Sequence, residues 1–147
     1  MTGMPPVYPP FRAGGWDGAD RVHDEIQAAE LGADARERGG TLVQITGGSA
    51  RRAMPGRGLW AAGAAATRAL THAAAQEWRE AGVHVALLIV DATIDSPKTA
   101  AMTRGSAPEA TASQEDVARA VAALAAQSPR GFTHELVITP AGDRWLP

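Results

Sequence analysis

The sequence predicts an α/β fold with three layers, in which a parallel sheet of about three strands lies between long helices. Short apolar segments rich in β-branched residues alternate with longer segments of helical spacing, in the order helix, strand, helix, strand, helix, strand. Strands that alternate with helices are joined by right-handed crossovers, which place them parallel in one sheet. In addition, the apolar run at 83–90 is typical of a strand that is covered on both faces.

The composition restricts the function before any motif is considered. The chain has 147 residues, with 14 Lys and Arg against 16 Asp and Glu, which gives a net charge of −2. This length is typical of one domain, which we expect over 18–147 behind an arm over 1–17. The near-neutral charge argues against nucleic-acid binding, which needs a clustered positive surface. The absence of cysteine excludes disulfides and thiolate-ligated metals.

The sequence shows no targeting signal and no membrane anchor. The N-terminus has neither a basic region nor an apolar stretch. The apolar run at 83–90 is too short to cross a bilayer, and the Ala-rich run at 61–75 is interrupted by polar residues. We therefore expect a cytoplasmic protein without a membrane partner.

The first 38 residues are expected to form an arm and a helix. Four prolines between residues 5 and 10 disfavour helix and predict an extended, Pro-rich arm over 1–17. Asp17 to Arg38 has apolar residues at helical spacing, and Gly39-Gly40 then provides a stop.

The middle of the chain predicts a strand and the longest helix. Thr41 to Thr46 is a short β-branched strand, and a Gly- and Arg-rich loop follows it as far as Gly58. Leu59 to Ala81 has helical spacing and is ended by Gly82. The stripe expected to be buried consists of Leu59, Ala62, Ala66, Leu70, Ala73 and Trp78.

The remaining elements follow the apolar strand at 83–90. A long connection is expected over 91–113. Ser113 then fits a capping box and begins a helix whose inner face carries Val117, Val121 and Leu124. Leu136-Val137-Ile138 is the last predicted strand.

From Gly39 onward the order of these segments resembles the C-terminal half of the short-chain dehydrogenase/reductase family. Gly39-Gly40-Thr-Leu-Val-Gln-Ile-Thr46 resembles the strand that carries the family's catalytic serine, and Leu59 to Leu70 resembles the helix with its Tyr-x-x-x-Lys motif. Gly82 to Leu87 is similar to the next strand, and Glu115-Asp116-Val117-Ala118 to the opening of a later helix. The resemblance covers about residues 18–142. It implies a half-Rossmann-like fold and NAD(P)-dependent oxidoreductase chemistry.

The catalytic positions that the resemblance implies are all replaced. The family's tyrosine acts as general acid/base, its lysine lowers the pKa of that tyrosine, and its serine polarises the substrate oxygen. Here the serine position is Gly47, the tyrosine position is Trp60 and the lysine position is Ala64. An indole does not titrate near neutral pH. Trp60 either packs at the start of its helix or lines an altered pocket.

The family's cofactor loop is also absent. That Gly-rich turn meets the pyrophosphate at a helix N-terminus, and no such strand, turn and helix precede residue 18. Ile94 and Ser96 resemble the segment that touches the nicotinamide and are the candidate cofactor contacts. We expect no bound cofactor, and NAD(P) only if the missing half of the site is supplied from elsewhere.

Four polar residues are further candidates for a pocket. Thr46 and Ser49 flank Gly47 and would either donate to a ligand or satisfy a local turn. Asp91 and Thr93 follow the central strand, at the edge where open α/β sheets bind ligands. Asp91 would either act there or order its loop.

No metal site is predicted. The four histidines have neither metal-ligand spacing nor an evident carboxylate partner. They are His23, His72, His84 and His134.

Three functions remain open. The first is a catalytically silent family relative that acts as a binding or structural subunit, because a three-stranded sheet leaves an open edge at Thr41–Thr46. The N-terminal arm, a second copy or a partner chain would cover that edge. The second is an NAD(P)-dependent oxidoreductase whose N-terminal half is missing from this chain or supplied by a partner. The third is a non-redox enzyme that uses Asp91 or Thr46. The substrate and the natural length of the protein stay open.

Overall fold

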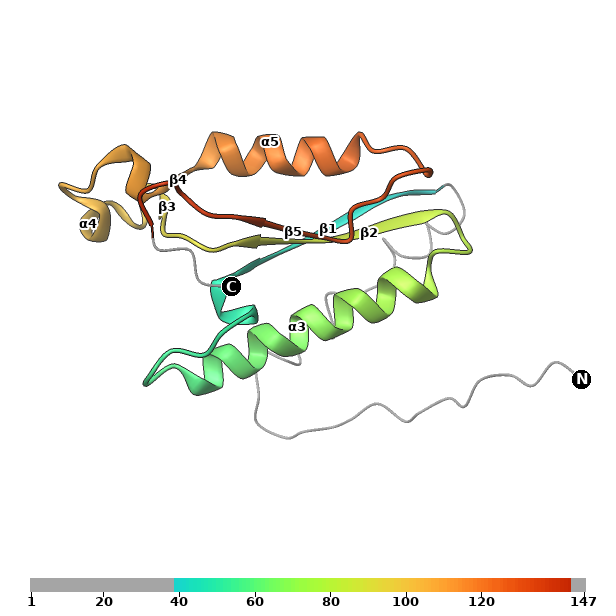
Figure 1. Ribbon diagram of the computed structural model, residues 1–147, viewed down its shortest axis with the longest axis horizontal. Helices are drawn as coiled ribbons and strands as arrows, with labels where there is room; N and C mark the ends of the chain where they lie inside the picture. Colours follow the sequence, from blue (N-terminus) through green and yellow to red (C-terminus); the bar gives the residue numbers. More distant parts are fainter. Residues whose placement is uncertain (1–38, 144–147) are drawn as a thin grey trace, which may run out of the picture.

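The structure is a computed structural model that describes residues 39–143 (Figure 1). The Pro-rich arm expected over 1–17 and the helix expected over 17–38 lie outside the described residues, as does His23. Within the described part, the order of elements is β1 (Gly40–Gly47), η1 (Gly48–Ala50), α3 (Gly58–Glu77), β2 (Val83–Val90), β3 (Ile94–Asp95), α4 (Ala100–Thr103), η2 (Pro108–Ala110), β4 (Ala112–Ser113), α5 (Gln114–Ala125) and β5 (Glu135–Ile138).

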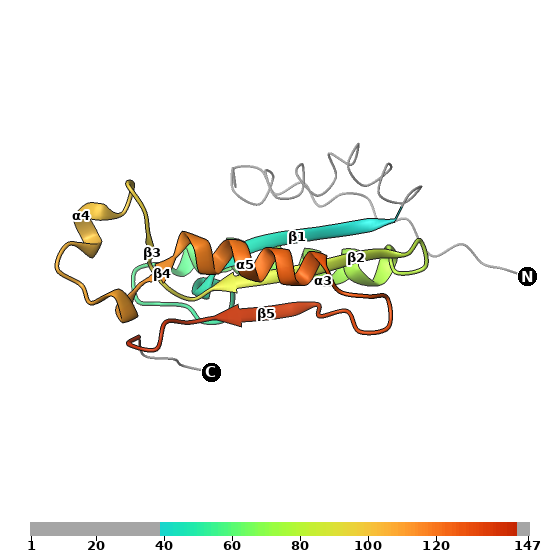
Figure 2. The same ribbon diagram turned by 90° about the horizontal axis from the view of Figure 1, so that it is seen from above.

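A parallel sheet in the order β1-β2-β5 forms the middle layer. Helix α5 covers one face of this sheet and α3 covers the other, as Figures 1 and 2 show. The three-layer parallel α/β fold predicted from the sequence is therefore confirmed. Within residues 39–143 no helix is both long and apolar enough to cross a membrane.

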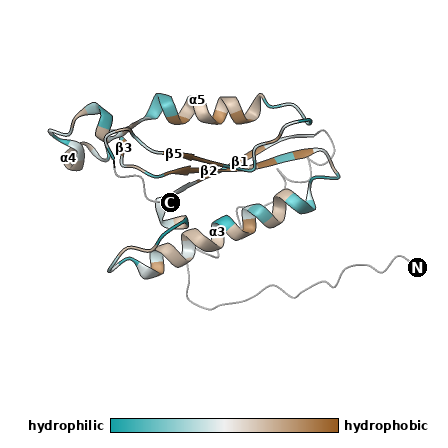
Figure 3. Ribbon diagram, in the orientation of Figure 1, coloured by the Kyte–Doolittle hydropathy of each residue, from teal (hydrophilic) through white to brown (hydrophobic). Residues whose placement is uncertain are grey.

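Strand β2 is the centre of the core because it pairs with both neighbours. Its register runs from Gly40 opposite Val83 to Gly47 opposite Val90 on one side, and from Leu87 opposite Glu135 on the other. All eight of its residues are buried, and Figure 3 shows the apolar character of the strand. A strand that is covered on both faces does not alternate apolar and polar residues. The apolar run at 83–90 therefore predicted β2 with the correct bounds.

Successive residues of β2 contribute to the two faces of the core. On the α3 face, Val83 and Val85 pack with Trp78. On the α5 face, Leu88 packs with Leu124. The inner face predicted for α5 is confirmed, because Val117 and Val121 pack against this second cluster.

The predicted N-cap at Ser113, at the start of α5, is also confirmed. The Ser113 hydroxyl oxygen accepts a hydrogen bond from the Asp116 backbone N–H at 3.0 Å, which satisfies a donor that the helix itself leaves free. The Ser113 hydroxyl in turn bonds the Asp116 carboxylate, and this bond together with Arg119 holds the pKa of Asp116 below its ordinary value.

The stripe expected to be buried on α3 is confirmed at Trp78, whereas Ala66 and Leu70 are only half-buried and the other three residues are exposed. Leu59, Ala62 and Ala73 are exposed, with Leu59 at 76%. The buried residues are instead Ala61, Thr67, Thr71, Ala74, Ala75 and Trp78. Threonine can be buried here because its hydroxyl donates back to the preceding turn, from Thr67 to the Gly63 carbonyl at 3.1 Å and from Thr71 to the Thr67 carbonyl at 2.8 Å.

Two further boundaries differ from the prediction. Helix α3 ends at Glu77, and residues 78–81 form a turn that leads to Gly82, whose φ of 73° favours glycine. The connection expected over 91–113 contains short elements of its own, because β3 pairs with β4 as a separate two-stranded sheet.

An ion cluster joins α3 to the edge strand β5. The Arg68 guanidinium donates from Nε to Glu135 Oε2 at 2.7 Å and from Nη2 to Oε1 at 2.9 Å. His72 Nε2 lies 3.0 Å from Glu135 Oε2. The expectation that His72 lacks a carboxylate partner is therefore wrong, because its partner is distant in the sequence. Burial raises the pKa of Glu135, but the hydrogen bond and charge of Arg68 outweigh it, with help from His72, and the net pKa is lowered.

We expect Glu135→Gln to reduce the loss of stability in acid. A carboxylate whose pKa is lower in the folded state contributes stability above its unfolded pKa, and this contribution is lost as the pH falls through the folded value. The free energy of unfolding, measured with urea, should therefore fall less steeply in the variant than in the parent between about pH 5 and pH 3. Glu77→Gln, at an exposed carboxylate of α3, is the control. Equal slopes for all three proteins would contradict this role of Glu135.

Candidate functional site

The three strands of the main sheet end at one edge, because they are parallel. These ends are Gly47, Val90 and Ile138. At this edge, the segment that follows β1 meets Asp91, which follows β2. Open α/β sheets bind their ligands there, so this edge is the candidate site.

An ion pair between Arg52 and Asp91 ties the ends of β1 and β2 together. Arg52 Nη2 donates to Asp91 Oδ1 at 3.0 Å, and Nη1 donates to Oδ2. The Asp91 residue is only 7% exposed, whereas the Arg52 side chain is 29% exposed. The hydrogen bond to Asp91 is the main reason that the pKa of Arg52 lies above its ordinary value. Both carboxylate oxygens of Asp91 thus accept from one guanidinium, and Asp91 orders the loop that follows β1.

Gly48 allows this close approach. A Cβ atom placed on Gly48 would lie 1.9 Å from Asp91 Oδ1 and 2.5 Å from its carboxyl carbon. Real Cβ atoms do not come so close to another atom, so a side chain at position 48 and the ion pair exclude one another. The glycine is required by the neighbouring carboxylate, and not by a turn.

The three positions that the resemblance assigns to the family's catalytic residues lie in three different environments. Gly47 is the last residue of β1 and is exposed. Ala64 is half-buried and packs against the apolar cluster of Ala50, Leu87 and Ile89. Trp60, in the first turn of α3, is 72% exposed, so the interpretation of this residue as a packing side chain is wrong.

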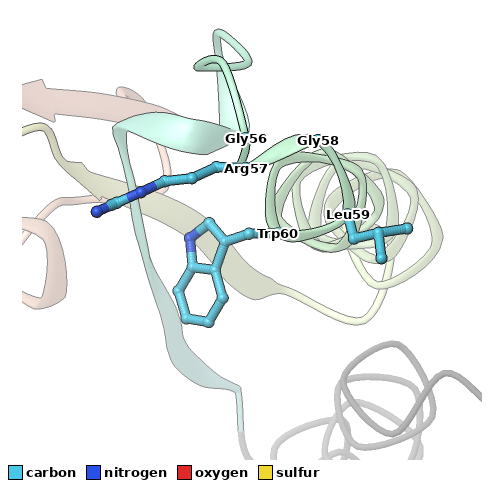
Figure 4. Close-up of a pocket in the computed structure, with 5 residues that line it drawn as sticks. All are labelled: Gly56, Arg57, Gly58, Leu59 and Trp60. Atoms are coloured by element: carbon cyan, nitrogen blue, oxygen red, sulfur yellow. The ribbon is translucent and has the colours of Figure 1, made fainter.

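Trp60 lines an open pocket with its neighbours in the chain. The lining residues are Gly56, Arg57, Gly58, Leu59 and Trp60. In Figure 4 the side chains of Arg57 and Trp60 point to the same side, away from Leu59. The pocket is built from one stretch of sequence, and neither Thr46 nor Asp91 lines it.

The other predicted site residues are partly used in local structure. Thr46 and Ser49 are half-buried near the end of β1, on the same edge as Asp91, whereas Thr93 is exposed. Ser96 is part of a turn, because its backbone N–H donates to Thr99 Oγ1 at 3.0 Å and its hydroxyl lies 2.9 Å from the same atom. The Ile94 carbonyl accepts from that Thr99 hydroxyl.

No metal site is formed by residues 39–143. No group of three or more His, Asp or Glu side chains in this range is placed to hold an ion. Two of the histidines nevertheless meet, since the rings of His84 and His134 are 5.9 Å apart, edge to face.

Arg52 is the site residue that the sequence reasoning missed. Arg51, Arg52 and Arg57 form a basic cluster in the sequence, but nothing in the cluster distinguishes Arg52 from the other two. Its partner Asp91 lies 39 residues further along. The one available signal was an aspartate directly after a nearly all-apolar strand, where burial requires a partner.

The parallel order of the sheet, the two covering helices and the polar edge define a Rossmann-like α/β protein. No protein-family model matches the sequence, and no curated protein matches it. Solved structures do match. A structure described as a short chain dehydrogenase/reductase family protein is 26% identical with a TM-score of 0.69, and the match covers 90% of this chain and 60% of that one.

Two further structures show the same likeness. A short-chain dehydrogenase from Rhodopseudomonas palustris is 24% identical with a TM-score of 0.56, over 85% of this chain and 47% of that one. The closed form of a serine dehydrogenase complexed with NADP+ is 13% identical with a TM-score of 0.74, over 94% of this chain and 60% of that one. The chain thus has the fold of the short-chain dehydrogenase/reductase family, as the resemblance implied. It spans about half to three fifths of the length of these structures.

Proposed function

We propose that this chain is a catalytically silent relative of the short-chain dehydrogenases, and that it acts as a binding or structural subunit. One observation carries the proposal. At the positions that correspond to the family's serine, tyrosine and lysine, the chain has no titratable group. The positions hold Gly47, Trp60 and Ala64.

The chemistry of carbonyl reduction explains why this matters. Hydride transfer to a carbonyl carbon leaves charge on the oxygen, which must receive a proton from a nearby acid. Glycine has no side chain, and the indole N–H of Trp60 does not titrate in the required range. Ala64 carries no charge and packs in an apolar cluster. These positions supply neither a proton nor a cation.

The ion pair at the edge of the sheet supports the same proposal. A general base needs a carboxylate with a free oxygen that faces the substrate. Both oxygens of Asp91 accept hydrogen bonds from Arg52, and the residue is almost fully buried. Asp91 is therefore better suited to hold the two strand ends than to act on a ligand.

The open edge of the sheet supports a binding role. Within residues 39–143, β1 pairs only with β2. An unpaired strand edge is usually covered by another segment or another chain. We place the partner at Thr41–Thr46, and a second copy of the chain is the simplest such partner.

An NAD(P)-dependent oxidoreductase is the alternative. One observation favours it, since a protein of the same fold binds NADP+ and is longer than this chain. In this alternative the cofactor-binding half is missing from this chain or supplied by a partner. Ile94 and Ser96 would then contact the cofactor.

We expect that NADH and NADPH do not bind the chain saturably at concentrations up to about 1 mM, a limit that corresponds to roughly 4 kcal/mol of binding free energy. Tryptophan fluorescence measures this directly, and Trp60→Phe is the control because Trp60 is itself one of the altered positions and is 72% exposed. Saturation below about 100 µM, roughly 5–6 kcal/mol, would overturn the proposal in favour of the alternative. Sedimentation in the same solutions determines whether the chain self-associates, as a subunit with a covered β1 edge should.

A further inference from the structure

We propose that a pocket at the opposite end of the sheet binds a small oxyanion, namely phosphate or the phosphate group of a phosphomonoester. The pocket has a volume of about 390 Å³, which is within the range of small-molecule sites. Its lining residues are Arg79, Pro129, Arg130, Gly131, Phe132 and His134.

Two turns that are distant in the sequence form this pocket. Arg79 lies in the turn between α3 and β2, and residues 129–134 lie in the loop between α5 and β5. Figure 1 shows both connections at the end of the sheet where β2 begins. The Arg52–Asp91 pair lies at the other end, where β2 finishes. The proposed site is therefore separate from the candidate site described above and independent of the proposed function.

The charge of the pocket is positive and unopposed. Neither guanidinium, of Arg79 or of Arg130, has a hydrogen-bond acceptor or a carboxylate partner in the described part of the chain. No Asp or Glu lines the pocket. His134 uses Nδ1 to bond the Val85 carbonyl at 2.9 Å, which leaves its Nε2 as the other polar atom of the ring.

The loop that carries Arg130 is held in place before any ligand binds. The Gln127 side chain accepts from the Thr133 backbone N–H at 2.7 Å and donates to the Thr133 hydroxyl at 2.9 Å. His84 is fully buried, and its Nε2 lies 2.9 Å from the Thr133 carbonyl. The His84 ring stacks on Phe132 with centroids 4.1 Å apart. The backbone of this loop therefore needs little reordering when a ligand binds, and only the two arginine side chains have to be ordered.

The residue types select the ligand class. A guanidinium presents parallel N–H donors that match the oxygens of phosphate in pairs. Two guanidiniums in one pocket favour an oxyanion over a halide, because phosphate offers several oxygens to paired N–H donors and chloride does not. Both free phosphate and a phosphomonoester supply the required group, and the experiment below separates them.

The test is calorimetric titration of the chain with inorganic phosphate and, separately, with phenyl phosphate, at constant ionic strength set with chloride. We expect saturable binding of at least one of them, and Arg79→Gln and Arg130→Gln should each weaken it at least tenfold. Tighter binding of phenyl phosphate assigns the site to phosphomonoesters, and equal or tighter binding of inorganic phosphate assigns it to the free anion.

Arg104→Gln is the matched control. Arg104 is also exposed and without a side-chain partner among the described residues, but it follows α4 at the far end of the molecule. The control should bind as the parent does. Failure to saturate with either probe overturns the proposal, and so does an equal loss of affinity in all three variants. The side chains of Arg79 and Arg130 make no hydrogen bond or ion pair within the described part of the chain, so both variants should fold. As a second measurement, the backbone amide NMR signals of residues 129–134 in the parent should shift when phosphate is added.

Discussion

Gly48→Ala is expected to lower the free energy of unfolding by about 2–4 kcal/mol, more than most glycine-to-alanine changes. The new methyl group would overlap the Asp91 carboxylate, since its carbon would lie 1.9 Å from Oδ1. Either the backbone after β1 moves or Asp91 gives up Arg52. In the second case a nearly buried charge loses its partner, which is a large cost in proteins. Urea denaturation of parent and variant measures the difference.

A double-mutant cycle isolates the cause of this effect. In an Asp91→Ala background the carboxylate is gone, so Gly48→Ala should then cost less than about 1 kcal/mol. Gly63→Ala is the matched control within α3, where an added Cβ would meet nothing within 4 Å. There alanine should stabilise the helix by about 0.5–1 kcal/mol. An unchanged cost of Gly48→Ala in the Asp91→Ala background would show that the carboxylate is not responsible.

Leu88→Ala is expected to lower the free energy of unfolding by about 2–5 kcal/mol. Leu88 is fully buried in the middle of β2 and packs under α5 with Leu124. Its truncation removes apolar contacts and leaves a cavity that the covered strand cannot readily close. A loss of this size is a large fraction of the total stability of a small domain, so the variant should unfold at a much lower urea concentration.

Leu59→Ala provides the same chemical change at an exposed position. Leu59 is 76% exposed at the start of α3, so its truncation should change the free energy of unfolding by no more than about 0.5 kcal/mol. Comparable losses at positions 59 and 88 would mean that Leu59 is covered in solution. Such a result would point to an interface on the first turn of α3 and would contradict the burial described above.

Local sequence signals predicted the three strands of the main sheet and the helices α3 and α5. The nearly continuous apolar run, interrupted only by His84, predicted β2 with the correct bounds, because a strand buried on both faces has no polar side. The cap at Ser113 was predictable for a similar reason, since donor and acceptor are three residues apart. Both signals depend only on near neighbours in the chain.

The details that depend on distant contacts could not be predicted in this way. The buried face of α3 uses Thr67 and Thr71, which rank low in hydropathy and are buried only because their hydroxyls are satisfied within the helix. The partners Arg52 and Asp91 come from different segments. Only the parallel register of β1 and β2 brings them together, and that register is a property of the fold.

The central position of β2 also has a consequence for the synthesis of the chain. Its parallel neighbours are separated from it by long crossovers, so every contact in this sheet joins residues that are far apart in sequence, and such topologies fold slowly.

As the chain emerges from the ribosome, β2 is complete before α5 and β5 exist. During that interval an eight-residue segment, Val-His-Val-Ala-Leu-Leu-Ile-Val, has one open edge and one uncovered face. It is strongly β-prone and carries no acidic or basic side chain other than histidine, which is the character of an aggregation-prone sequence. The strand that organises the finished core is therefore also an aggregation-prone segment of the nascent chain.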